Sequence, residues 1–591
     1  MLGSDKHFLN SPLTLVVDSL KGLCAANPNL KLDAENKVLY QANPDRSKVA
    51  LICGGGSGHE PAHAGFVGNG MLTAAVCGNI FASPNASQVR RGIELVDNDQ
   101  GTLIIVKNYT GDVLNFGLAK ENYAASHPDK SNKVKFVNIG DDVAVGRSQG
   151  KIVGRRGLAG TVLAYKIAGA LARSGASLVQ VYDLTTWISA RLGTVGVGLE
   201  HCHVPGTEAA RFHLSENEVE IGMGIHNEPG HTRVSPIPPL NALVSQLLDL
   251  IMSTTDNDRS FLPFKNDGSD EVVLMVNNLG GLSELEMSGI AGEAVKILGG
   301  KGKIHRVLIG SFMTSLNMPG FSLTLLLLPR SSDSNAPSTS DILALLDEKV
   351  EAPGWRWSST QPPIPISQIT SVPSTESKSA QNYPKIAAPS AQGFVSVISK
   401  ACKALIVAEP DITQMDKIAG DGDCGFTLKA GAEGVLKEVD NGNITENDII
   451  GSVLSIAKQA EVQMGGTSGA LYSIFFSSLA QGLSSTVTSQ AIKVTPKVWS
   501  SALEYALDRL FSYTRARPPS RTLVDPLAAF VQTFSSSDFA NAVKAAAAAA
   551  EDTRNLDAKA GRSAYVESDF LKKEKVADPG AWGVKVILEN L

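Results

Sequence analysis

The stretch "KVALICGGGSGHEPAHAG", Lys48 to Gly65, begins with an apolar run and continues into glycines and two histidines. A short continuous apolar run is typical of a strand buried on both faces. The glycines that follow it let backbone N–H groups approach a ligand closely. The pattern is not the dinucleotide fingerprint, because His59 stands where the last glycine of GxGxxG would fall. The stretch therefore predicts a buried strand of an α/β domain that ends in a ligand-binding turn.

The same strand pattern returns along the first 330 residues, where it alternates with helical patterns. The further runs are "TLIIVKNY" (102–109), "VKFVNIG" (134–140), "EVVLMVNN" (271–278), "HRVLIGSF" (305–312) and "FSLTLLLL" (321–328). Alternating buried strands and helices indicate an α/β architecture. A region of this length is expected to hold two α/β subdomains.

The composition changes after about residue 352. Residues 353–389 are rich in Ser, Thr, Pro and Gln and show no apolar period, which is typical of a linker. Beyond residue 390, segments such as "VWSSALEYALDRLFSYTRA" carry helix formers at helical spacing. We predict a multidomain protein: an α/β domain at 1–352, a linker at 353–389 and an all-helical bundle or barrel at 390–591.

Charge and cysteine content narrow the possible partners. The 591 residues are 43% hydrophobic and carry a net charge of −6, which argues against nucleic acid or an anionic membrane as the main partner. The six cysteines form no CxxC pair, as expected for reduced cytoplasmic thiols. No apolar run is long enough for a bilayer and no secretory signal is present, so we expect a cytoplasmic protein.

Two further segments of the α/β region carry polar groups suited to chemistry. Lys107 and Asp112 follow a buried strand, at the end where α/β sheets bind ligands. His226 lies in "GMGIHNEPGH" (222–231), a glycine-rich loop of the kind that displays functional groups. His201 and His203 add an HxH pair, so a histidine metal site with His226 and His231 is an alternative, although no carboxylate has a recognisable ligand spacing.

The helical region contains the strongest signal, "MDKIAGDGDCGFTL" at 415–428. Asp416, Asp421 and Asp423 place three carboxylates within eight residues. Such carboxylates repel one another unless a hard cation neutralises them, and Mg²⁺ takes oxygen ligands while leaving positions for phosphate. The spacing does not fit an EF-hand. The alternative is a solvated acidic turn that caps a helix.

Four more loops of this region could hold a nucleotide. They are "QMGGTSGALY" (463–472), "SRTLVDPL" (520–527), "GRSAYV" (561–566) and "DPGAWG" (578–583). The chain contains no GxxxxGK[ST] motif. Together with the aspartates, these loops predict a magnesium–nucleotide site without a P-loop.

In this order, "GGGSGHEP", "KNYTGD", "GIHNEPG", "GSFMTSLNMPGFSLTLL" and "GDGDCG" resemble the single-chain, fungal-type dihydroxyacetone kinases over nearly the whole chain. The resemblance implies an N-terminal domain that binds dihydroxyacetone and a helical domain that binds ATP with Mg²⁺. It also implies glyceraldehyde as a second substrate and a homodimer. Glycerol, which has no carbonyl, would be rejected.

The resemblance also implies residue roles. His226 corresponds to the histidine that adds to the substrate ketone as a covalent hemiaminal, His59 to the histidine that assists, and Asp112 to the base for the attacking hydroxyl. The remaining matches are Gly56, Ser57, Gly58 and Lys107 for substrate, and Asp416, Asp421 and Asp423 for metal. The nucleotide pocket corresponds to Cys424, Gly425, Phe426, Thr427, Thr467, Ser468, Thr522, Leu523, Arg562, Asp578, Pro579 and Gly580.

Three other functions compete with an ATP-dependent kinase. A phosphotransferase-system variant would recharge bound ADP from a phosphohistidine protein, but such systems usually keep the two domains on separate chains. A non-catalytic carbonyl-binding protein would not need His226, His59, Asp112 and the three aspartates together. A zinc-dependent hydrolase would use the histidine cluster.

Overall fold

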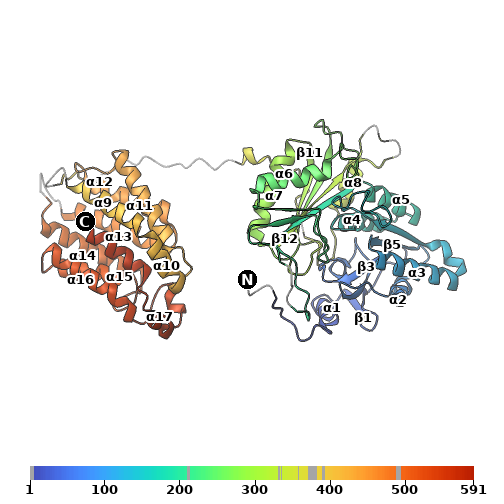
Figure 1. Ribbon diagram of the computed structural model, residues 1–591, viewed down its shortest axis with the longest axis horizontal. Coiled ribbons are helices and arrows are strands. Elements are labelled where there is room, and N and C mark those ends of the chain that lie inside the picture. The colour runs from blue at the N-terminus through green and yellow to red at the C-terminus, as the bar shows by residue number, and fades with distance from the viewer. Residues whose placement is uncertain are drawn as a thin grey trace. The chain divides into compact units, whose positions relative to one another are not determined.

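The computed structural model describes residues 5–208, 213–330, 333, 336–356, 358–369, 383–388, 393–486 and 494–591. The chain divides into an N-terminal unit, residues 1–373, and a helical unit, residues 374–591. Figure 1 shows that the first contains two sheets and the second only helices among the described residues. The predicted fold class, two α/β subdomains followed by an all-helical domain, is confirmed. The predicted domain limits at 352 and 390 stay predictions.

The first sheet of the N-terminal unit is built around the opening stretch of sequence. Its strand order is β1-β2-β4-β3-β5-β6, and β3 is parallel to both β4 and β5. The strands are β1 (Leu30–Asp33), β2 (Val38–Gln41), β3 (Ala50–Ser57), β4 (Ala74–Ile80), β5 (Thr102–Lys107) and β6 (Val134–Ile139). Because β3 and β5 run in parallel, the residues that follow them come to the same edge of the sheet.

The second sheet is mixed, with the order β11-β10-β12-β7-β8-β9. Strand β10 is parallel to β11 and antiparallel to β12. The strands are β7 (Leu192–Gly198), β8 (Val219–Ile221), β9 (Thr232–Val234), β10 (Glu271–Asn278), β11 (Lys303–Gly310) and β12 (Gly320–Leu327). The loop between β11 and β12 and the loop between β8 and β9 both extend to the site described below.

Helices cover both sheets, and one helix is shared. The helices of this unit are α1 (Leu15–Ala26), α2 (Ala86–Val96), α3 (Thr110–Ser126), α4 (Gly160–Arg173), α5 (Leu178–Ser189), α6 (Leu240–Met252), α7 (Glu284–Gly299) and α8 (Thr339–Asp347). On β5, Ile104 and Val106 pack against α2 and α3, whereas Leu103 and Ile105 belong to the core that contains α4. The same core includes Met275 of the second sheet, so α4 joins the two subdomains.

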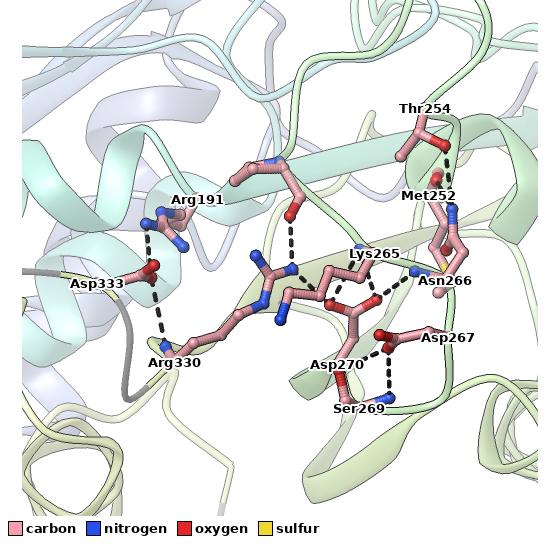
Figure 2. Close-up of polar contacts among 11 residues, drawn as sticks. Arg191, Met252, Thr254, Lys265, Asn266, Asp267, Ser269, Asp270, Arg330 and Asp333 are labelled. Carbon is pink, nitrogen blue, oxygen red and sulfur yellow. Dashed lines mark hydrogen bonds and ion pairs between the residues drawn. The ribbon is translucent and has the colours of Figure 1, made fainter.

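An ion pair between a half-buried arginine and a buried aspartate fixes the loop that leads into β10 (Figure 2). Asp270 is fully buried and accepts hydrogen bonds from the backbone N–H groups of Lys265 and Asn266. Arg330, just after β12, donates to the same carboxylate at 2.6 Å. Removing one partner of such a pair costs about 3–5 kcal/mol, because the other charge stays buried. This contact therefore holds the second sheet to its own connecting loop.

The helical unit surrounds an apolar interior. Its helices are α9 (Phe394–Val407), α10 (Glu409–Ala419), α11 (Cys424–Asp440), α12 (Ile449–Gln459), α13 (Gly466–Thr486), α14 (Pro496–Tyr513), α15 (Val524–Phe534), α16 (Phe539–Asp552), α17 (Ser568–Glu574) and α18 (Pro579–Glu589), with a π-helical turn at Ala460–Met464. A cavity of about 460 Å³ lies between them and is lined almost wholly by apolar side chains, among them Phe475, Leu479 and Phe530.

Two general features concern the cysteines and the helices of the described residues. All six cysteines lie in described segments and are free thiols. Within the described residues, every helix is either too short or too polar to span a bilayer.

Candidate active site

His59 lies at the end of β3 and is fully buried. Its Nδ1 lies 2.9 Å from the carbonyl oxygen of Thr314, so this nitrogen carries the hydrogen. Phe81 stacks on the ring at a centroid distance of 5.2 Å. Burial, followed by the nearby charges of Lys107 and His226, holds the pKa of His59 well below its usual value. The ring is therefore fixed in place, and a proton on its Nε2 would be readily given up to an acceptor.

His226 lies in the loop between β8 and β9 and meets His59 directly. The two Nε2 atoms are 3.0 Å apart and the rings are edge-on, with an interplanar angle of 89°. The other nitrogen, Nδ1, lies 3.1 Å from Oε1 of Glu228. About a fifth of the His226 side chain is exposed, so this ring, unlike that of His59, can be reached from solvent. The structure thus brings together two histidines that are 167 residues apart in sequence.

The loop between β11 and β12 holds both histidine segments. Thr314 N–H donates to the carbonyl of His59, and Leu316 N–H donates to that of Gly58. The Ser315 hydroxyl donates to the carbonyl of Ile225 at 2.6 Å. Leu316 has a positive φ of 50°, a backbone conformation that costs energy for a branched residue. The site therefore lies where the two subdomains of the N-terminal unit meet.

Lys107 and Asp112 lie beside the histidines at the end of β5 and the start of α3. Both side chains are buried, and the Lys107 Nζ and Asp112 Oδ1 atoms have no hydrogen-bond partner among the described residues. Burial lowers the pKa of Lys107, although the charge of Asp112 opposes this. Burial raises the pKa of Asp112, although the charge of Lys107 opposes this. The buried Lys107 ammonium and the unpartnered Oδ1 of the buried Asp112 carboxylate are suited to a polar ligand.

The glycines of the opening stretch make room for these side chains. A Cβ on Gly56 would lie 2.8 Å from the backbone nitrogen of Ala82, and one on Gly58 would lie 2.7 Å from the Phe81 ring. A Cβ on Gly55 would lie 3.1 Å from Asp112 Oδ2. Ser57 is buried and its hydroxyl donates to the carbonyl of Gly78. Ser57 thus fixes the turn, and its hydroxyl hydrogen is already used.

The alternative histidine metal site is not assembled. His203 Nδ1 pairs with Nε2 of His7 at 2.8 Å, whereas His201 faces Glu200. His231 contacts Arg259. Among the described residues, the only group of three or more metal-ligating side chains close enough to share an ion lies in the helical unit.

That group is Asp416, Asp421 and Asp423, as the sequence predicts. One ligand atom from each lies within 4.8 Å of the others. Asp416 is buried on α10 and accepts a hydrogen bond from Cys424 N–H at 2.9 Å, while Asp421 and Asp423 are exposed. Gly422 has a φ of +84°, which lets the chain turn sharply between the last two carboxylates. One buried and two exposed carboxylates suit a hard cation that also binds a ligand.

The residues after the aspartates begin α11. Cys424 and Gly425 are buried, and a Cβ on Gly425 would lie 2.5 Å from the carbonyl of Glu409 on α10. Burial raises the pKa of the Cys424 thiol, so it favours the neutral form. Phe426 is 59% exposed, and Thr427 is half-buried. Of this predicted set, Phe426 offers the largest open surface.

The predicted residues Thr467 and Ser468 lie in the first turn of α13. Gly465 and Gly466 precede them with positive φ, and no atom lies within 4 Å of where a Cβ would stand. The backbone is therefore open at the start of a 21-residue helix. Helix N-termini of this kind bind phosphate through free N–H groups and the helix dipole.

Four of the remaining predicted residues, Thr522, Leu523, Asp578 and Gly580, lie near a buried arginine or its contacts. Thr522 and Leu523 follow Arg521, whose guanidinium is fully buried and donates to the Val576 carbonyl. Its Nη1 lies 3.9 Å from Oδ2 of Asp578, which caps α18 at the Asp578-Pro579-Gly580 turn. Burial raises the pKa of Asp578 to about 6, although the Ala581 N–H and Arg521 oppose this. Arg562 begins a 3₁₀ turn, and its side chain lies outside the described part of the structure.

Two domain families match the two units. The Dak1 domain matches residues 21–354 and the DAK2 domain matches residues 418–591. The dihydroxyacetone kinase of Pichia angusta is 41% identical over 612 residues, covering 99% of this chain and 98% of that protein. The chain belongs to the dihydroxyacetone kinase family. Dihydroxyacetone kinase 1 of Saccharomyces cerevisiae is 42% identical over 98% of this chain and 97% of its own.

A relative with a different name and two solved structures of one enzyme are also similar to this chain. The human triokinase/FMN cyclase is 38% identical, covering 100% of this chain and 99% of its own length. The dihydroxyacetone kinase of C. freundii, in complex with AMP-PNP and Mg²⁺, is 30% identical with a TM-score of 0.64, covering 99% of both chains. The native form of that enzyme gives the same TM-score at 32% identity.

Sequence reasoning missed several residues of this dihydroxyacetone kinase family member. Phe81, Tyr109 and Thr314 surround the two imidazoles, and Glu228 accepts hydrogen bonds from the backbone N–H and the ring Nδ1 of His226. Glu228 lies two residues after His226, so its place in the same motif was an available signal. The others come from distant loops and carry no common chemical type.

Proposed function

We propose that this chain transfers the γ-phosphoryl group of ATP to a terminal hydroxyl of dihydroxyacetone, and of glyceraldehyde. The observation that carries the proposal is the pair of imidazole nitrogens 3.0 Å apart beside buried Lys107 and Asp112. The same chain carries a separate cluster of three carboxylates. Phosphoryl transfer needs positioning and charge neutralisation more than covalent chemistry on phosphorus, and the two clusters divide these tasks.

Asp416, Asp421 and Asp423 would hold magnesium. Their donor set fits, because all three offer carboxylate oxygens within 4.8 Å and two of them are exposed. When bound there, the ion would neutralise charge on the phosphate oxygens. The open N-terminus of α13, with Thr467 and Ser468, would bind phosphate. The surface of Phe426 and the turn at Asp578-Pro579-Gly580 would face the rest of the nucleotide.

His226 would capture the substrate as a covalent hemiaminal. Its Nε2 lone pair would form a bond to the carbonyl carbon while the carbonyl π pair moves to oxygen, which takes a proton and becomes a hydroxyl. Glycerol lacks a carbonyl and would not be captured, which gives a selectivity that contacts to so small a molecule could not supply. Gly56, Gly58 and Lys107 would line the space that the substrate enters.

Asp112 would accept the proton of the terminal hydroxyl as that oxygen attacks phosphorus. Burial raises the pKa of Asp112, so its carboxylate is a stronger base than a solvated one. Lys107 would keep enough of it ionised to act. We also propose a homodimer in the cytoplasm, without nucleic-acid or membrane partners, which light scattering on the purified protein and fractionation of cells would test.

A coupled assay tests the activity. Purified full-length protein with Mg²⁺, ATP and dihydroxyacetone, and no added phosphoprotein, is expected to release ADP in proportion to substrate consumed. No ADP release would contradict the proposal. Activity that requires a phosphohistidine protein would indicate the phosphotransferase variant instead.

A further inference from the structure

In each of the two imidazoles, the Nδ1 atom faces an oxygen acceptor of another residue. His59 Nδ1 faces the Thr314 carbonyl at 2.9 Å, and His226 Nδ1 faces the Glu228 carboxylate at 3.1 Å. A carbonyl or carboxylate oxygen only accepts, so each Nδ1 carries a hydrogen. The two Nε2 atoms, 3.0 Å apart, would then both be bare if both rings were neutral. Two lone pairs at that distance repel, whereas one proton between them makes a hydrogen bond.

Glu228 is held as a carboxylate in contact with His226. It accepts from the His226 backbone N–H at 2.8 Å as well as from Nδ1. Burial opposes its charge, but the hydrogen bonds and charge of His226 lower the pKa of Glu228 to about 2. A Cβ on Gly224 would collide with both Glu228 and Arg156, so the absence of one lets these groups approach. Arg156 is itself fixed by Asp142 and by the Gly222 carbonyl.

We infer that Glu228 is a positioning residue that fixes the Nδ1–H form of His226 and supplies the counter-charge for one proton shared by the His59 and His226 rings. The inference rests on the proposed covalent capture.

The proton balance of the capture step follows from this arrangement. As substrate arrives, the shared proton resides on His59 Nε2, and His226 Nε2 bonds to the carbonyl carbon. The carbonyl π pair moves to oxygen, which takes the proton from His59. His59 ends neutral, and the alkylated His226 ring carries the positive charge beside Glu228. The total charge is the same before and after, so no proton enters or leaves.

Capture should therefore depend on pH through this pair. The other charged or titratable groups around it are Lys107, Asp112, Glu60, His63, Tyr109 and Arg156. Above the pH at which the pair loses its proton, the adduct must take one up, so capture should weaken about tenfold per pH unit. An opposite charge at this distance typically shifts a pKa by about one to three units. Without the Glu228 charge, the weakening should begin at a lower pH by about that amount.

The experiment measures the fraction of dihydroxyacetone labelled with ¹³C at the carbonyl carbon that becomes tetrahedral on the full-length protein. Carbon NMR separates the ketone from the adduct, and spectra are taken from pH 5.5 to 9. Glu228→Gln keeps the size and an acceptor oxygen but removes the charge. Glu271→Gln is the matched control, because Glu271 contacts His305 at 3.1 Å in the same unit.

We expect Glu228→Gln to lose the adduct at a pH about one to three units lower than the unmodified protein, and Glu271→Gln to match the unmodified protein. Glu228→Asp keeps the charge, so it should capture dihydroxyacetone more weakly but begin to lose the adduct at the same pH as the unmodified protein. The inference would be overturned if Glu228→Gln began to lose the adduct at the same pH as the unmodified protein, whatever its affinity for dihydroxyacetone. It would also be overturned if Glu228→Asp lost the adduct at the lower pH expected for Glu228→Gln. Substrate bound without a tetrahedral carbon in the unmodified protein would instead overturn the covalent capture itself.

Discussion

The two reactive clusters of this chain differ in how complete they are. In the N-terminal unit, His59, Lys107 and Asp112 are buried, and each histidine ring is fixed by an acceptor at Nδ1. In the helical unit, Asp421 and Asp423 are exposed, and the glycines before α13 have open space beside them. In the first cluster the two imidazoles already contact each other, and Lys107 and Asp112 are buried before any ligand binds. The second presents groups that a ligand must complete.

This difference follows from what each cluster would bind. A small ketone brings little binding energy, so the groups that react with it must be positioned beforehand. A nucleotide with a cation brings several charges, and its ligands need open coordination positions. The comparison predicts that the N-terminal site is sensitive to geometry and the helical site to charge.

The largest effect is expected from Asp421→Ala, which removes one exposed carboxylate of the cluster. Loss of metal stabilisation worth several kcal/mol should lower kcat about 10³-fold, while capture of dihydroxyacetone in the N-terminal unit is unchanged. ADP release and substrate binding are measured on the same preparation. If substrate capture fell together with turnover, the two clusters would not be independent.

His226→Ala should have the next largest effect. In this variant capture of dihydroxyacetone should be lost while nucleotide binding is retained, the reverse of Asp421→Ala. Removal of the reacting nitrogen should lower kcat/KM for dihydroxyacetone about 10²-fold or more, and magnesium-dependent nucleotide binding should persist. Isothermal titration with AMP-PNP gives the second quantity. Full selectivity for dihydroxyacetone over glycerol in this variant would disprove the assignment of His226.

Asp578→Asn tests charge inside the helical unit. Burial raises the pKa of Asp578 from 3.8 to about 6, so its ionisation opposes folding at pH 7 and this cost disappears as pH falls toward 4. A shift of about two units corresponds to about 3 kcal/mol. Asn can still cap α18. The free energy of unfolding of the helical unit should therefore be larger at pH 7 in the variant than in the unmodified protein, and it should depend less on pH.

The measurement is urea unfolding of the full-length protein at pH 5 and pH 7, followed by helical circular dichroism. An Asn variant that is less stable than the unmodified protein at pH 7 would show that the contact with Arg521 outweighs burial.

Gly56→Ala should have the smallest effect and tests geometry in the N-terminal unit. The new Cβ would lie 2.8 Å from the Ala82 backbone, so the Phe81 loop must move, at about 1–3 kcal/mol. KM for dihydroxyacetone should rise. Gly117→Ala is the control, because no atom within 4 Å meets its Cβ and alanine favours a helix. Equal KM values in both variants would show that the site tolerates movement of that loop.

The sequence predicted strands best where they are rich in large apolar residues. Each of the six quoted runs overlaps a strand of the structure. Strands β4, "AAVCGNI", and β7, "LGTVGVG", were missed because alanine and glycine give little apolar signal. Their small residues are required by close packing: a Cβ on Gly193 would lie 2.6 Å from Leu262 and 2.9 Å from Ile251. That requirement exists only once distant segments are packed together.

By itself, the sequence determined the division into an α/β part and a helical part, and the cluster of three aspartates. These follow from local properties: the apolar period, the residues that interrupt it, and carboxylates a few residues apart. Only the tertiary structure decided that His59 and His226 share a contact, that Glu228 faces the second nitrogen of His226, and that Lys107 and Asp112 are buried beside them. Those contacts join loops from two sheets, and no local pattern encodes the distance between two such loops.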